Sequence, residues 1–165
     1  MFPEHLQQLA TTIIAEAKRK NVLIVSAESC TGGLIMGCLT EMPGSSSVVD
    51  GGFICYSYDS KVSNLGIDLA LLQATGAVSG EVAVQMATGA LKNSKATIAV
   101  SATGIAGPGG ATPNKPVGLV YIGIANGRTG KSFSMKNLFS GDRSAVRLAT
   151  VETALTAIRQ ELDAI

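Results

Sequence analysis

Asn21-Val22-Leu23-Ile24-Val25 is a short apolar run, and Ser26-Ala27-Glu28-Ser29-Cys30-Thr31-Gly32-Gly33 follows it directly. The first run is rich in branched aliphatic residues, which predicts a buried strand. The next run, Leu34-Ile35-Met36-Gly37-Cys38-Leu39, is compatible with a helix, which we expect over about Thr31 to Thr40. A strand–turn–helix junction places hydroxyl groups beside the free N–H groups of a helix N-terminus, where negative charge is stabilised. The junction is therefore a candidate site for a nucleophile with an oxyanion, or for a bound phosphate.

The flanking sequence predicts helices that alternate with strands. Helices are expected at Glu4 to Lys20, Lys61 to Leu65, Leu69 to Thr75, after Ser79 and after Asp142, strands at Val22–Val25, Phe53–Tyr56 and Thr97–Ser101, and a hairpin from Gly118–Ile124 and Ser132–Met135. Helices separate the early strands and flank the late hairpin. This pattern indicates an α/β fold: a single-domain, three-layer α/β/α sandwich with a mixed sheet of about five to six strands.

Composition narrows the class of protein. The 165 residues are 46% hydrophobic and 15% charged, which argues against disorder and for one domain over residues 1–165. A net charge of +1 without a basic block gives little support for contact with nucleic acid. No leader pattern and no apolar run of membrane-spanning length is present, so we expect a cytoplasmic protein without membrane contact. Three cysteines without CxxC spacing and a single histidine favour neither a disulfide framework nor a zinc site.

Ser29 is the candidate nucleophile, and a serine hydroxyl needs an adjacent base to react. The only histidine, His5, lies in the predicted first helix, so a Ser-His-Asp triad is disfavoured. A lysine can serve instead if desolvation or a neighbouring cation lowers its pKa until it is neutral. Lys61, just beyond a predicted buried strand, is the best candidate, and Tyr56 could relay a proton or hold the lysine.

Each of these residues also has an ordinary structural explanation. A serine before a helix is most often an N-cap, a lysine after a strand is most often a solvated charge, and Tyr56 could be a half-buried strand residue. Cys30 could itself attack an electrophile, or it could pack in the core as expected of Cys38 and Cys55. Sequence spacing alone does not show that Ser29, Tyr56 and Lys61 meet.

Two further segments could bind an anion. The loop Thr103-Gly104-Ile105-Ala106-Gly107-Pro108-Gly109-Gly110 would let backbone N–H groups approach a ligand, although it could equally be a turn that needs positive φ angles. It has neither the Walker ending nor dinucleotide-binding spacing. Arg143, at the start of the last helix, could hold a phosphate or carboxylate with two hydrogen bonds, or could be an exposed first-turn arginine. Arg147, one turn later, is expected to support the surface.

The ordered set of motifs closely resembles the C-terminal, deamidase domain of the CinA (competence/damage-inducible) family over almost the whole chain. The matching segments are Ala27-Glu28-Ser29-Cys30-Thr31-Gly32-Gly33, Pro43-Gly44-Ser45-Ser46, Tyr56-Ser57 with Lys61, Gly76-Ala77-Val78-Ser79, Thr103 to Gly110, Lys115-Pro116-Val117-Gly118 and Phe139-Ser140-Gly141-Asp142-Arg143. One departure is Tyr58, where the family commonly has Asn. The resemblance is to the stand-alone form, without the additional N-terminal nucleotide-hydrolysing domain of larger CinA proteins.

The resemblance implies a PncC-type nicotinamide mononucleotide deamidase, which forms nicotinate mononucleotide and ammonia in pyridine-nucleotide recycling. The family's catalytic serine, lysine and tyrosine then correspond to Ser29, Lys61 and Tyr56. Substrate contacts are expected at Ser46, Thr103, Gly104, Gly107 and Arg143, and oxyanion donors at Thr31, Gly32 and Gly33. A pyridinium substrate already carries an electron-withdrawing charge, so neither a metal nor another cofactor is expected.

Two other functions stay open from the sequence. A non-catalytic nucleotide-binding module of a competence or DNA-damage response would also account for the glycine loops and the anion sites. An amidase for another small carboxamide would use the same nucleophile. In each case the expected partner is a small molecule, and helices around a small domain favour a homo-oligomer.

Overall fold

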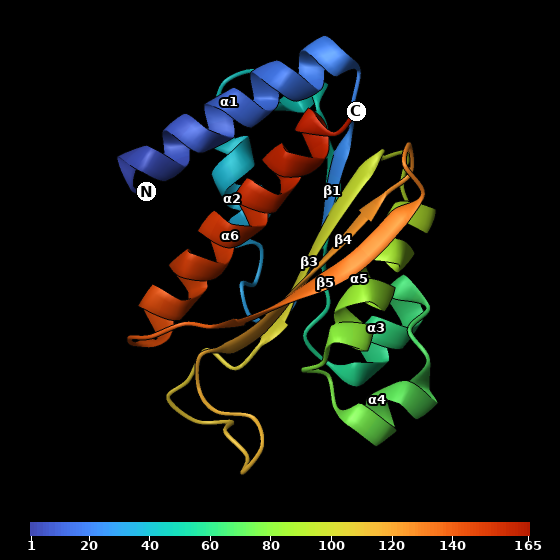
Figure 1. Ribbon diagram of the computed structural model, residues 1–165, viewed down its shortest axis with the longest axis vertical. Helices are drawn as coiled ribbons and strands as arrows, with labels where there is room; N and C mark the ends of the chain where they lie inside the picture. Colours follow the sequence, from blue (N-terminus) through green and yellow to red (C-terminus); the bar gives the residue numbers. More distant parts are fainter.

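A five-stranded mixed sheet forms the centre of the computed structural model, which describes residues 1–165 (Figure 1). The strands are β1 (Ile24–Glu28), β2 (Val49–Ile54), β3 (Ile98–Gly104), β4 (Leu119–Asn126) and β5 (Lys131–Leu138), in the order β2-β1-β3-β4-β5. β1 is parallel to both β2 and β3, whereas β4 and β5 form an antiparallel hairpin beside β3. This confirms the predicted mixed sheet.

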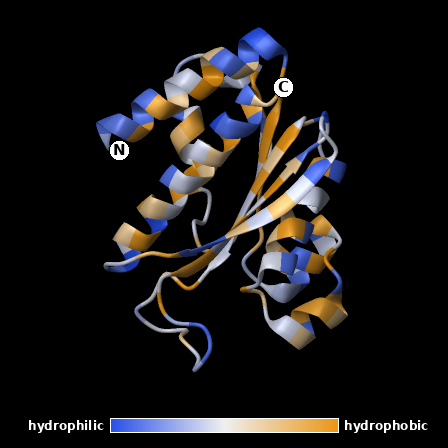
Figure 2. Cartoon of the chain, viewed as in Figure 1, coloured by the Kyte–Doolittle hydropathy of each residue, from blue (hydrophilic) through white to orange (hydrophobic).

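Helices cover both faces of the sheet and complete the three layers (Figure 1). They are α1 (Glu4–Lys20), α2 (Leu34–Thr40) and α6 (Arg143–Asp163) on one face, α3 (Tyr58–Leu65), α4 (Leu69–Thr75) and α5 (Gly80–Lys92) on the other, with a short 3-10 helix, η1 (Ser45–Ser47), before β2. A core of 27 buried residues packs under α1, α2 and α6, and a second core of 12 packs under α3, α4 and α5. Figure 2 shows hydrophobic residues along the central strands and also in the helices on both faces of the sheet. No helix is long and apolar enough to cross a membrane.

Several predicted boundaries were wrong near the junction after β1. The strand runs to Glu28 instead of ending at Val25, because the polar residues Ser26 and Glu28 are buried and hydrogen-bonded to each other. α2 begins at Leu34 rather than Thr31, because Gly32 and Gly33 adopt φ angles of 60° and 99° in the preceding turn.

Boundaries around the second and third strands also differ. β2 covers Val49–Ile54 instead of Phe53–Tyr56. It is an edge strand in which partly buried and exposed residues alternate, so its first half lacks the continuous apolar run that predicts a strand. α3 starts at Tyr58 rather than Lys61, because the Ser57 hydroxyl caps it by accepting the Ser60 N–H. β3 runs from Ile98 to Gly104, beyond the predicted end at Ser101.

The connections bring the segments after β1 and β2 together at the carboxyl ends of these strands. From β1 the chain passes to α2 on one face of the sheet, and from β2 it passes to α3 on the other face. In open α/β sheets, ligands bind outside the carboxyl ends of the strands. Ser29 follows β1 and Lys61 follows β2, so the topology brings both to this end of the sheet.

Candidate active site

Ser29 and Lys61 meet at the carboxyl ends of β1 and β2. The Ser29 N–H donates to the carbonyl of Ala102 in β3 at 2.9 Å, which fixes the residue at the end of the sheet. Lys61 lies in α3, and its Nζ is 3.0 Å from the Ser29 Oγ. The structure thus brings together, at hydrogen-bond distance, two residues that are 32 positions apart in the sequence.

The Lys61 amine is buried and faces only neutral groups. The side chain has no exposed surface, and Nζ donates to the carbonyls of Cys55 at 2.7 Å and Tyr56 at 3.4 Å. No carboxylate forms an ion pair with it. Desolvation by burial lowers the pKa of Lys61, while the nearby thiols of Cys55 and Cys30 oppose this shift. A buried lysine without a counter-charge favours the neutral amine, which is the form that can accept a proton.

Cys30 adjoins Ser29 but is a poor alternative nucleophile. Burial raises the pKa of its thiol to about 11, so the thiol stays protonated at neutral pH. The thiolate is the reactive form of cysteine, and thiolate formation is suppressed here. The Ser29 hydroxyl therefore has the Lys61 amine at hydrogen-bond distance, and the thiol next to it in the sequence stays in its unreactive, protonated form.

The side chain of Glu28, the last residue of β1, caps the N-terminus of α2. Its fully buried carboxylate accepts the N–H groups of Gly33, Ile35 and Met36 at 2.9, 3.1 and 3.0 Å and the Ser26 hydroxyl at 2.9 Å. The anion expected at this helix terminus is thus supplied by the chain itself. The Gly33 N–H is committed to Glu28, and the Gly32 N–H donates to the Ser29 carbonyl at 3.2 Å. This corrects the expectation that the N–H groups of Gly32 and Gly33 face an oxyanion.

Two backbone donors beside Ser29 are left without partners. The N–H groups of Cys30 and Thr31 make no hydrogen bond, and the buried Thr31 hydroxyl also has none. Buried polar groups are nearly always paired, so an unpaired cluster calls for an explanation. A negatively charged oxygen beside Ser29 would supply the missing acceptor.

Arg147 holds the other side of the same loop. From α6, its Nε donates to the Cys30 carbonyl at 3.1 Å and its Nη2 to the Thr31 carbonyl at 2.9 Å. The sequence had suggested only a surface role for Arg147. Both partners are main-chain carbonyls more than 100 positions away, so no side-chain motif could have revealed the contact.

Arg143, Gly107 and Tyr56 form a second cluster, which adjoins Lys61 through Tyr56. Arg143 Nη1 donates to the Gly107 carbonyl at 2.9 Å, and Nη2 donates to the Tyr56 hydroxyl at 3.3 Å. A cavity of about 480 Å³ opens here, lined by residues 106–108, 117 and 141–144. Only the main-chain carbonyl of Tyr56 is hydrogen-bonded to the Lys61 amine, whereas its hydroxyl accepts from Arg143 and makes no hydrogen bond with Lys61.

The remaining predicted contacts are placed differently. The Thr103 hydroxyl donates to the Ala77 carbonyl at 2.8 Å, so it joins the end of β3 to the loop between α4 and α5. Gly104 packs against β4, where a Cβ would lie 2.7 Å from the Leu119 carbonyl oxygen. Ser46 lies in η1, just before Val49, which pairs with the first residue of β1. Ser29 follows the opposite end of that strand, so Ser46 and Ser29 do not meet within one chain.

Comparison with known proteins identifies the family. The sequence model of the CinA C-terminal domain matches residues 6–162. The chain belongs to the CinA C-terminal domain family. A protein of Enterobacter agglomerans named nicotinamide-nucleotide amidohydrolase PncC is 45% identical over 97% of this chain and 98% of its own length. The crystal structure of competence/damage inducible protein CihA from Agrobacterium tumefaciens, at 45% identity, superposes with a TM-score of 0.95 and 98% coverage of both chains.

Other relatives of this CinA C-terminal domain are longer proteins. One from Caldicellulosiruptor saccharolyticus, whose name refers to competence and damage induction, is 49% identical over 94% of this chain. The chain spans 38% of the length of that relative.

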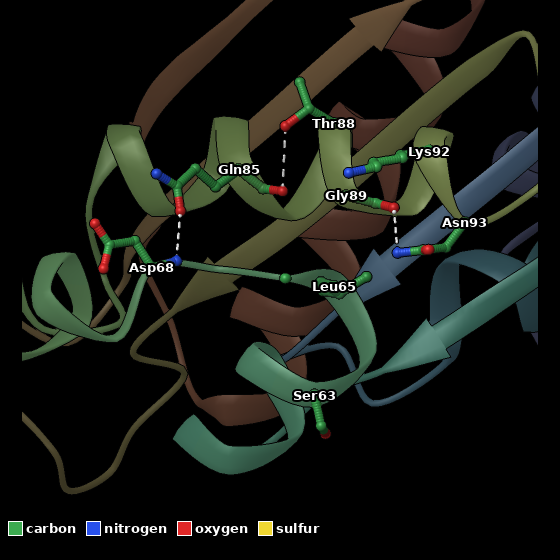
Figure 3. A pocket seen from close by; sticks show the side chains of 9 residues that line it. Ser63, Leu65, Asp68, Gln85, Thr88, Gly89, Lys92 and Asn93 are labelled. Atoms are coloured by element: carbon green, nitrogen blue, oxygen red, sulfur yellow. Dashed lines mark hydrogen bonds between the residues drawn. The ribbon is translucent and has the colours of Figure 1, made fainter.

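A separate pocket of the CinA C-terminal domain, of about 420 Å³, lies where α3 crosses α5 (Figure 3). Its polar groups satisfy one another: the Asp68 N–H donates to Gln85, and the Asn93 amide donates to the Gly89 and Asn64 carbonyls. None of the predicted site residues lines it. A Cβ at Gly89 would lie 2.2 Å from the Leu65 carbonyl oxygen, so the pocket borders a close crossing that holds the helix carrying Lys61. No group of three or more His, Cys, Asp or Glu side chains that could hold a metal ion is present anywhere in the chain.

Proposed function

We propose that this chain hydrolyses the carboxamide of nicotinamide mononucleotide to nicotinate mononucleotide and ammonia, as a step of pyridine-nucleotide recycling. The observation that carries the proposal is the buried Lys61 amine, which has no ion-pair partner and lies 3.0 Å from the Ser29 hydroxyl. The name of the Enterobacter agglomerans relative, which covers the full chain, supports the choice of substrate.

The hydrogen-bonding capacity of a neutral amine fits the Lys61 environment. Such an amine has two N–H donors and one lone pair. The carbonyls of Cys55 and Tyr56 take the two donors, which leaves the lone pair for the Ser29 hydroxyl proton. Lys61 would then be held in one orientation as a general base.

In the proposed reaction, Ser29 Oγ bonds to the carboxamide carbon while its proton passes to Lys61 Nζ. The tetrahedral intermediate collapses with cleavage of the C–N bond, and Lys61 returns the proton to the departing ammonia. Water then attacks the resulting ester, gives one proton to Lys61, and releases the nicotinate product as Ser29 regains its proton. The N–H groups of Cys30 and Thr31 would stabilise the oxyanion in both tetrahedral intermediates, a contribution of about 3–4 kcal/mol per donor in a comparable hydrolase.

Binding of the nucleotide is assigned to the second cluster. The Arg143 guanidinium, whose fork of donors suits a phosphate, borders the 480 Å³ cavity beside Tyr56. We place the phosphate of the substrate against Arg143 and the backbone near Gly107. The pyridinium carboxamide would then extend past Tyr56 to Ser29.

Ammonia release from purified protein with nicotinamide mononucleotide tests the proposal. We expect Ser29→Ala to remove turnover while ligand binding and the thermal unfolding midpoint stay close to wild type. The matched control is Cys30→Ala, which removes the neighbouring thiol and should leave most of the activity.

Ammonia release by Ser29→Ala near the wild-type rate would reject the nucleophile. Binding of the nucleotide without turnover by wild type would favour the binding module. Turnover of another small carboxamide, but not of this nucleotide, would favour the alternative amidase.

A further inference from the structure

The geometry points to Arg147 as a positioning residue that orients the oxyanion donors of the Ser29 site. The inference rests on the proposed amide hydrolysis. Arg147 is in α6, 118 positions from Ser29, and its two hydrogen bonds go to main-chain carbonyls of the catalytic loop. It would act on the reaction through the peptide groups that it holds.

The argument starts from the planarity of the peptide group. In a trans peptide the C=O and the N–H of one plane point in opposite directions. The Cys30 carbonyl and the Thr31 N–H belong to one such plane. Because Arg147 Nε binds the Cys30 carbonyl at 3.1 Å, the Thr31 N–H must point away from Arg147.

The neighbouring planes are fixed in the same way. The Ser29 carbonyl accepts the Gly32 N–H, which sets the plane that contains the Cys30 N–H. The Thr31 carbonyl accepts from both Arg147 Nη2 and the Leu34 N–H. The carbonyls of Ser29, Cys30 and Thr31 therefore each have a partner, whereas the N–H groups of Cys30 and Thr31 donate to no other residue.

An arginine is needed for this arrangement because one planar group reaches two successive carbonyls. Its guanidinium presents donors in a fixed fork, whereas a lysine ammonium is a single point on a flexible stem. No carboxylate forms an ion pair with Arg147, so its charge is not committed to a salt bridge. Its contacts with the loop are to backbone carbonyls alone.

Free rotation of the Cys30–Thr31 peptide would remove the oxyanion donor without removing Ser29 or Lys61. Loss of one such donor in a comparable hydrolase costs about 10²–10³-fold in kcat. We therefore expect Arg147→Met, which keeps the unbranched stem, to lower kcat for nicotinamide mononucleotide by about 10²-fold with little change in KM. Arg147→Lys keeps the charge but loses the fork, and its kcat should fall nearly as far.

Three readouts separate this role from general support of the fold. Guanidinium at non-denaturing concentration should restore part of the kcat of Arg147→Ala, but none of that of Ser29→Ala. Arg159→Met is the matched control, because Arg159 is an exposed arginine on the same helix, and it should keep wild-type kinetics. A crystal structure of Arg147→Met should show a reoriented Cys30–Thr31 peptide.

The possible outcomes distinguish the inference from the proposed function. A wild-type protein that releases no ammonia would reject the proposed function. An active wild type whose kcat survives Arg147→Met, or an Arg147→Lys variant with wild-type kcat, would reject the positioning role alone. A rise in KM at unchanged kcat would also reject it, since that pattern belongs to a residue that binds substrate in the ground state.

Discussion

Two loops follow the carboxyl ends of parallel strands, the loop between β1 and α2 and the loop between β3 and β4. They differ in how firmly hydrogen bonds hold the backbone. In the first, the backbone from Ser29 to Gly33 is held by Glu28, Arg147 and the end of β3. In the second, residues 108–114 are exposed, and the loop projects from the body of the molecule (Figure 1). The only strand-like pairing within this loop is an isolated β-bridge between Thr112 and Lys115.

The difference corresponds to two tasks of the proposed amide hydrolysis. Bond formation requires the reacting atoms to be held within a fraction of an ångström, which a buried turn with hydrogen-bonded carbonyls can do. Binding a nucleotide requires exposed backbone and a cation, which the β3–β4 loop and Arg143 offer at the rim. Substitutions in the first region should therefore change kcat, and substitutions in the second should change KM.

The largest effect is expected from Lys61→Met. Removing the general base should lower kcat by roughly 10³-fold, within the 10²–10⁴-fold range of acid–base catalysis. Met has a similar length and needs no hydrogen bond, so the folded state should be at least as stable as wild type. Ammonia release and thermal unfolding measure the two quantities, and an active Lys61→Met or Lys61→Arg variant would refute a neutral lysine base.

The pH dependence follows from the same burial. Because the pKa of Lys61 is lowered in the folded protein, the proposed base becomes neutral below the usual lysine range, and kcat should rise with pH through that value. The unfolded chain, with a pKa near 10.4, then binds more protons at Lys61 than the folded chain between the two pKa values. The contribution of Lys61 to the free energy of unfolding should therefore increase with pH across this interval and be absent in Lys61→Met. Chemical denaturation of both proteins at several pH values measures the difference.

Glu28→Gln should have the next largest effect, and it tests the rigidity of the first loop. A glutamine oxygen can replace some acceptors, but its NH₂ group would face the donors of α2. An unsatisfied buried donor costs about 1–3 kcal/mol, so both the unfolding midpoint and kcat should fall, with kcat lowered by roughly 10-fold. Glu81→Gln, at an exposed first-turn position of α5, is the control for loss of charge. Unchanged kcat in Glu28→Gln would mean that Ser29 does not depend on this cap.

These two substitutions also show what could be predicted from the sequence. The absence of a usable histidine pointed to Lys61 as the base for Ser29, and the structure places the two 3.0 Å apart. Helix α1 was predicted with the bounds Glu4–Lys20 that it has, and Ser79 and Asp142 cap their helices as expected. The bounds of α1 and the two helix caps depend on local periodicity and on short-range capping, which sequence patterns record.

Glu28 and Arg147 were missed for a physical reason. Each acts on backbone N–H or C=O groups, which every residue carries, so no residue type marks the partner. The sequence pattern placed Glu28 in a polar turn. In the structure it is the last residue of a buried strand, and its carboxylate accepts N–H groups at the N-terminus of α2. Ser46 was placed with the site by resemblance alone, whereas the register of β1 with β2 puts η1 at the far end of the sheet.

Arg143→Ala tests the binding region and should raise KM by roughly 10-fold, in line with the 1.5–3 kcal/mol attributed to a hydrogen bond with a charged group. kcat should change less, because Arg143 touches neither Ser29 nor Lys61. Arg128→Ala is the control for net charge, since Arg128 binds the carbonyls of Lys20 and Asn21 on another part of the surface. Steady-state kinetics decide the assignment: a loss confined to kcat would place Arg143 with the reacting atoms instead.

The smallest effects are expected from a pair of glycines in the β3–β4 loop, one buried and one exposed. Gly107 has a φ of 82°, and a Cβ there would lie 2.6 Å from the Val117 side chain, so Gly107→Ala should displace the carbonyl that holds Arg143 and raise KM a few-fold. Gly109 has no positive φ, and a Cβ there would have no other atom within 4 Å, so Gly109→Ala should leave KM unchanged. It could even stabilise the fold by about 0.4–1 kcal/mol through the unfolded chain. KM values for the pair decide what the loop contributes: equal increases would mean that binding needs a flexible loop, whereas an increase in Gly107→Ala alone means that it needs one carbonyl in place against Arg143.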